Sequence, residues 1–161
     1  MLGILAGSIA SKLYPDLDMG LVMQFALVHD LVEVHAGDTD TIVNTSVESM
    51  KQKSEREEQA LEKIKLSFGK DFGWIHNTIE KYESLDTKEA RFVKMLDKIL
   101  PKLTVILSNA ASFNNRGISK SQFQSVVDSQ KDKFQKLAYD MPELFELWEY
   151  FANKAAELIK D

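Results

Sequence analysis

Hydrophobic residues recur at intervals of three and four along most of the chain, which is the periodicity of an amphipathic α-helix. The first pattern runs to Leu13 and stops at Tyr14 and Pro15, because the residue before a proline avoids helical backbone angles. A second pattern begins after an acidic cap at 16–18 and ends at Gly37, a residue suited to a helix C-terminus. This second helix is apolar on most sides and is therefore predicted to lie in the centre of the fold.

Five further helices are predicted, and one of them contains Pro101, which should kink it. The charge-rich helix after 46 has only a thin apolar stripe, so we interpret it as a surface element; a binding surface is the alternative. Strand-type alternation never persists, which predicts an all-α bundle of about seven helices. The five segments are 46–68, 72–82, 86–111, a helix opened by Ser119 with Gln122, and a last one capped by 140–143 and reaching about Ile159.

Composition narrows the function classes. The 161 residues include no Cys, which excludes a disulfide framework, a zinc finger, an iron–sulfur cluster and thiol catalysis. With 25 acidic and 20 basic residues the net charge is -5, and no basic stripe is present, so we expect no nucleic-acid partner. An anionic substrate would therefore need a local positive charge to hold it, such as a metal ion.

The first ten residues could pass for a signal-peptide core, but they lack a basic flank and keep helical spacing at Leu2, Leu5 and Ile9. No apolar run approaches the ~20 residues of a membrane span, so we expect a cytoplasmic protein without a membrane partner. The helical pattern begins at Met1 without a cap. Either the first turn is frayed, or residues that normally precede it are omitted.

A polar cluster interrupts the second helix. Glu33 lies four residues after His29 and three after Asp30, so one side of a helix can present all of them. Burying such a cluster is costly, and a divalent cation is a natural compensation because it accepts imidazole nitrogen and carboxylate oxygen together. The alternative is a hydrogen-bonded His–Asp pair near the helix surface, with Glu33 in solvent.

A second carboxylate, Asp97, interrupts the apolar stretch 92–100. If its helix packs against the helix of His29 and Asp30, the three side chains converge on one point. The sequence therefore predicts a metal site. His35 and His76 are interpreted as partly exposed structural residues.

Two segments resemble a known family. Residues 26–39, which contain the His29 and Asp30 pair, look like the signature of the HD-domain metal-dependent phosphohydrolases, in the branch of the 5′-deoxynucleotidases. Residues 87–98 match the second block of that branch, which ends in an Asp-Lys pair. The resemblance implies a single HD domain over 1–161, incomplete at its N-terminus.

The resemblance also implies roles for individual residues. His29, Asp30 and Asp97 would be metal ligands, Glu33 would be the acid/base group beside the attacking water, and Asp38 would contact the sugar side of the substrate. The implied activity is hydrolysis of small nucleotide phosphomonoesters, deoxynucleoside 5′-monophosphates first, with Mn²⁺, Co²⁺, Fe²⁺ or Mg²⁺. A homodimer is compatible with it.

One departure bears on activity. The family site has a further metal-binding His about one helix before the HD pair, and no His precedes His29 here. The alternative function is therefore a metal- or nucleotide-binding module with weak or no catalysis.

Overall fold

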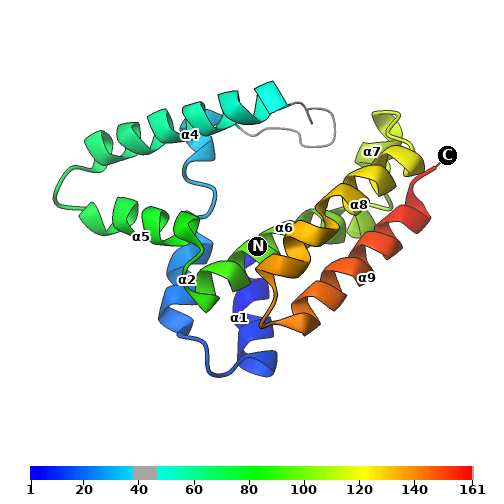
Figure 1. Cartoon of the computed structure of the whole chain (residues 1–161), viewed down its shortest axis with the longest axis horizontal. Coiled ribbons are helices and arrows are strands. Elements are labelled where there is room, and N and C mark those ends of the chain that lie inside the picture. The colour runs from blue at the N-terminus through cyan, green and yellow to red at the C-terminus, as the bar shows by residue number, and fades with distance from the viewer. Residues whose placement is uncertain (38–46, 161) are drawn as a thin grey trace. The chain divides into compact units, whose positions relative to one another are not determined.

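The computed structural model describes residues 1–37 and 47–160, and these residues form helices and no strand (Figure 1). The predicted all-α class is thereby confirmed. Seven of the helices in this part of the chain have ten or more residues, and α3 and α7 are short. The elements are α1 (Leu2–Leu13), α2 (Met19–Val28), α3 (Glu33–Ala36), α4 (Val47–Phe68), α5 (Gly73–Ser84), α6 (Lys88–Leu107), α7 (Ala111–Asn115), α8 (Lys120–Leu137) and α9 (Pro142–Leu158).

Several helices begin where local capping chemistry predicts. The Asp18 carboxylate accepts the backbone N–H groups of Gly20 and Leu21 at 2.8 and 3.2 Å, which satisfies two of the donors that a helix start leaves unpaired. Ser119 and Gln122 form a reciprocal capping box at the start of α8. Asp18 and the Ser119 cap are confirmed as predicted.

The second helix ends earlier than predicted. α2 stops at Val28 instead of reaching Gly37, and the next residues form a tight turn. In this turn Leu31 N–H donates to the Val28 carbonyl, and Glu33 N–H donates to the Asp30 carbonyl, both at 3.0 Å. These i→i−3 bonds replace the i→i−4 ladder of an α-helix before α3 begins. Gly37, with φ of 76°, ends α3 instead.

Two other expected boundaries were wrong. The helix containing Pro101 ends at Leu107 and not near 111, because Asn109 and Ala110 adopt left-handed backbone angles. Asp140 does not cap α9: the N-cap is Met141, without a side-chain hydrogen bond. The Asp140 carboxylate instead accepts a 2.8 Å hydrogen bond from Arg91, an ion pair that lies far away in sequence.

The chain divides into two compact units. One comprises residues 6–90, and the other comprises 1–5 together with 91–161. The expectation of one domain over 1–161 stays a prediction.

In the unit of residues 6–90, α4 contacts α3 and α5, and α2 contacts α5. The side chains between them form a buried apolar cluster. The rest of α4 is rich in charged side chains: Lys65 bridges Glu62 on its own helix and Glu80 on α5, at 3.1 and 2.9 Å. The long charged helix is thus a surface element, as predicted. The cluster consists of Val28, Val32, Ala60, Ile64, Ile75 and Ile79.

In the other unit, α8 and α9 run side by side (Figure 1). Their interface is built on Trp148, which is fully buried and lies edge-on to Phe134 and stacked on Phe145, with ring centres 5.2 and 5.9 Å apart. Such ring pairs add to the stabilisation that comes from burial alone.

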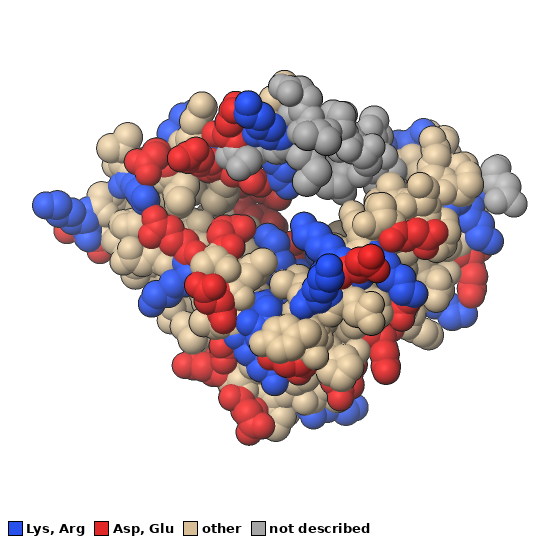
Figure 2. Space-filling model, in the orientation of Figure 1, with Lys and Arg blue, Asp and Glu red and all other residues tan. Residues whose placement is uncertain are grey.

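Acidic and basic side chains are interspersed on the face shown in Figure 2. Within residues 1–37 and 47–160, none of the helices has both the length and the hydrophobicity needed to cross a bilayer.

Candidate metal centre

His29 and Asp30 lie at the point where α2 ends. His29 is the C-cap residue of α2, and Asp30 is in the turn that follows. The neighbouring Val28 and Val32 belong to the buried cluster with α4 and α5, with 1% and 9% of their surfaces exposed. The turn is therefore fastened on both sides by packing, which limits the positions that the two polar side chains can take.

The imidazole of His29 is held by a backbone carbonyl. Its Nδ1 lies 2.9 Å from the carbonyl oxygen of Ala26. Because a carbonyl oxygen only accepts, Nδ1 carries the proton in this hydrogen bond, and Nε2 is the nitrogen left for another role. A backbone carbonyl bonded to one ring nitrogen is a common way to orient a histidine that binds metal through the other.

Nε2 of His29 lies 2.8 Å from Oδ2 of Asp30. A nitrogen lone pair and a carboxylate oxygen repel at this distance, so a positive charge must lie between them. That charge is either a proton on Nε2 or a metal ion that both atoms bind. A donor set of one imidazole nitrogen and carboxylate oxygens suits Mn²⁺, Fe²⁺ and Co²⁺, whereas Mg²⁺ prefers the carboxylate oxygens to the imidazole, so these residues fit a divalent ion.

Glu33 is the first residue of α3 and is half-buried. Since α2 ends at Val28, Glu33 reaches the neighbourhood of Asp30 through the turn and not along a continuous helix face. Its backbone N–H bonds to the Asp30 carbonyl. That the carboxylates of Asp30 and Glu33 serve one site stays a prediction. Asp38 lies outside the described residues.

Asp97 belongs to the other unit. It is on α6, between the fully buried Leu96 and the half-buried Lys98, and 21% of its side chain is exposed. Its Oδ2 lies 2.8 Å from Nζ of Lys98. Asp97 thus directly follows a fully buried residue of α6, while its convergence with His29 and Asp30 stays a prediction.

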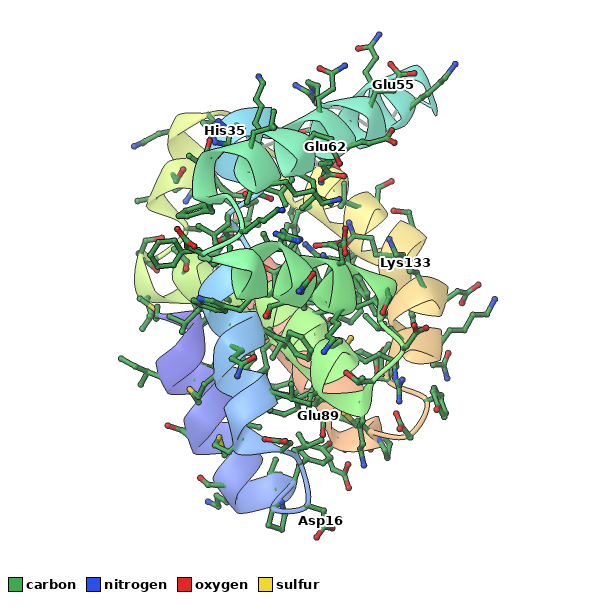
Figure 3. All side chains as sticks on the ribbon, turned by 90° about the vertical axis from the view of Figure 1, so that its left-hand side faces the viewer. Asp16, His35, Glu55, Glu62, Glu89 and Lys133 are labelled. Carbon is green, nitrogen blue, oxygen red and sulfur yellow. The ribbon has the colours of Figure 1, made fainter. Side chains whose placement is uncertain are left out.

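The other two histidines are partly exposed, as the sequence indicated. His35 is exposed on α3 (Figure 3), and His76 is half-buried on α5. The sequence did not indicate that Lys102 on α6 is buried, and burial, followed by the nearby charge of Lys98, lowers its pKa to about 8. The regular Lys spacing at 94, 98 and 102 was its only signal in the sequence.

The chain is similar to known proteins over most of its length. A family model described as HD domain matches residues 1–138. The chain therefore belongs to the HD-domain family of metal-dependent phosphohydrolases, and this membership implies a divalent metal ion.

Among curated proteins, the chain is similar to 5′-deoxynucleotidase HDDC2 of Mus musculus, with 29% identity over 113 residues, which are 70% of this chain and 53% of the mouse protein. The human protein of the same name is also 29% identical, over 70% of this chain and 52% of its own length. The chain thus spans about half the length of the curated relatives that it matches.

A solved structure is similar in fold. The predicted metal-dependent phosphohydrolase from Magnetospirillum magnetotacticum MS-1 superposes with a TM-score of 0.69, over 99% of this chain and 78% of the other, at 21% identity. At this identity the likeness concerns the fold alone.

Proposed function

We propose that this protein hydrolyses small nucleotide phosphomonoesters, with deoxynucleoside 5′-monophosphates as the substrates to test first, using a divalent ion bound by His29, Asp30 and Asp97. Each of these residues offers one ligand atom, an imidazole nitrogen or a carboxylate oxygen. The observation that carries the proposal is the His29 ring, which turns Nδ1 to the Ala26 carbonyl and Nε2 to the Asp30 carboxylate. The HD-domain match and the deoxynucleotidase relatives support it.

The proposed chemistry divides between the ion and the protein. A bound divalent ion polarises a phosphoryl oxygen and lowers the pKa of water, which makes a nucleophile available near neutral pH. Glu33, close to Asp30 in sequence and joined to it by a backbone hydrogen bond, accepts the proton of the attacking water. Asp38 contacts the sugar side of the substrate and so helps to orient the phosphate.

Metal binding is tested with the purified chain and three variants, His29→Ala, Asp97→Ala and His35→Ala. Mn²⁺ titration should show a site in the wild type that is lost in the first two variants. His35 is exposed on the neighbouring α3, so His35→Ala is the matched control and should bind as the wild type does. Mn²⁺ should also raise the melting temperature of the wild type, because a ligand of the folded state stabilises it. Equal binding in all four proteins would remove the proposed site.

Activity is measured as release of inorganic phosphate from deoxynucleoside 5′-monophosphates with each of the four metals. The alternative is a metal- or nucleotide-binding module with weak or no catalysis. Tight Mn²⁺ binding without phosphate release under any of these conditions would support that module over the hydrolase.

A further inference from the structure

Pro101 lies inside α6, four residues after the proposed ligand Asp97. In an α-helix the backbone N–H of residue i donates to the carbonyl of residue i−4. Proline has no N–H, so residue 101 cannot donate to the carbonyl of Asp97. The gap in the hydrogen-bond ladder of α6 therefore falls on the residue that would supply the metal ligand.

Two side chains close to Pro101 donate hydrogen bonds to backbone carbonyls of α6. The Thr104 hydroxyl donates to the Leu100 carbonyl at 3.0 Å, a back-bond that often accompanies helix bending. The Lys102 ammonium donates to the Lys98 carbonyl at 3.1 Å. Side chains that follow Pro101 thus supply hydrogen bonds to two backbone carbonyls that precede it.

Packing offers little reason for a proline here. Pro101 is exposed, so its ring contributes little to the core, and proline is the least favourable residue in a helix interior. The proposed ligands of the other unit have a similar setting: His29 and Asp30 follow directly where α2 gives way to a turn of i→i−3 bonds. In each unit the ligand lies at an interruption of helical hydrogen bonding. Locally unfavourable backbone features are often found at functional sites, where they serve the function.

Resting on the proposed function, we propose that Pro101 is a positioning residue of the metal centre. By removing one hydrogen bond from the ladder of α6 one turn after Asp97, it sets the direction of the Asp97 carboxylate. It also leaves the Asp97 carbonyl without the N–H of residue 101, and hydrogen bonding around a ligand residue is the kind of outer contact that tunes metal affinity.

The test compares Pro101→Ala and Pro101→Gly with Pro142→Ala. Both substitutions at 101 restore the backbone N–H. Gly has a much lower helix propensity than Ala, so comparing the two variants separates the effect of the hydrogen bond from the effect of helix propensity. Pro142 is at the first position of α9, where the missing N–H costs no helical bond, and it is therefore the matched control within the same unit. The readouts are Mn²⁺ affinity, the visible absorption of the Co²⁺-loaded protein, and the melting temperature in EDTA.

We expect Pro101→Ala to raise the metal-free melting temperature by about 5 °C while weakening Mn²⁺ binding by roughly tenfold or more. Pro101→Gly should weaken binding as well, with a smaller thermal shift, and both should change the Co²⁺ spectrum. Pro142→Ala should leave affinity and spectrum unchanged.

Two results would overturn the role of Pro101. One is wild-type Mn²⁺ affinity and an unaltered Co²⁺ spectrum in Pro101→Ala. The other is a lower metal-free melting temperature in that variant, since the proline would then serve the fold. The proposed function fails in a different experiment: if Asp97→Ala binds Mn²⁺ as the wild type does, Asp97 is no ligand and both proposals are wrong.

Discussion

The ammonium of Lys102 lies 4.9 Å from the ring centre of Trp148 and donates a hydrogen bond to the Lys98 carbonyl. The Trp148 ring and the Lys98 carbonyl both favour the charged form of Lys102, but neither of them is an anion. Burial outweighs them, and with the neighbouring Lys98 charge it lowers the pKa of Lys102 from 10.5 to about 8. Near neutral pH the unit of residues 1–5 and 91–161 therefore carries a buried, costly positive charge beside its largest fully buried side chain.

Replacing this lysine should stabilise the protein near neutral pH. The folded-state pKa is below the unfolded one, so the unfolded chain binds more protons between about pH 8 and 10.5, and wild-type stability rises with pH through that window. Lys102→Met removes the charge and should raise the free energy of unfolding at pH 7 by up to roughly 3 kcal/mol. Most of that gain should be gone by pH 10.

The measurement is urea denaturation of both proteins at pH 7 and at pH 10, in EDTA. Lys133→Met, on the exposed side of α8 (Figure 3), is the control, and its difference from the wild type should not change with pH. A Lys102→Met difference that is constant over this range would show that the lysine is not destabilised by burial.

Glu33→Gln separates metal binding from chemistry. The variant keeps the size of the side chain and removes the proton acceptor, so Mn²⁺ affinity should be retained while phosphate release falls by about 10²-fold or more. Titration with Mn²⁺ measures the affinity, and a phosphate assay on the same preparation measures the activity. Glu55→Gln, an exposed change on α4 (Figure 3), should leave both unchanged. Full activity in Glu33→Gln would show that another group moves the proton.

The apolar cluster beneath the His29 turn should control both stability and metal affinity. Ile64 on α4 is 2% exposed and packs in the cluster that contains Val28 and Val32. Ile64→Ala should cost about 2–4 kcal/mol in the free energy of unfolding, through lost burial and the cavity left behind. It should also weaken Mn²⁺ binding, because the turn between the two valines is less firmly held.

Leu66→Ala, two residues along the same helix, provides the contrast. Leu66 is 82% exposed, so its loss should change stability by no more than about 0.5 kcal/mol. Urea denaturation and Mn²⁺ titration of both variants make the comparison. Equal losses in the two proteins would mean that α4 does not support the ligand turn.

The sequence by itself determined the features that depend on near neighbours. The cap at Asp18 and the box formed by Ser119 and Gln122 were predictable because each satisfies N–H groups two or three residues away. The all-α class followed from apolar spacing, and the adjacent His29 and Asp30 marked the candidate site.

Only the tertiary structure decided features whose partners are distant in the chain or whose cost depends on surroundings. Asp140 looked like a helix cap, but it pairs with Arg91 because a charge-assisted bond between half-buried groups is stronger than a local cap. The break after Val28 is invisible in a continuous apolar pattern, since periodicity records which side is buried and not which carbonyl each N–H meets. The burial of Lys102 could not be predicted from the sequence either, because a lysine on a helix is usually solvated and only the packing around Trp148 excludes water from this one.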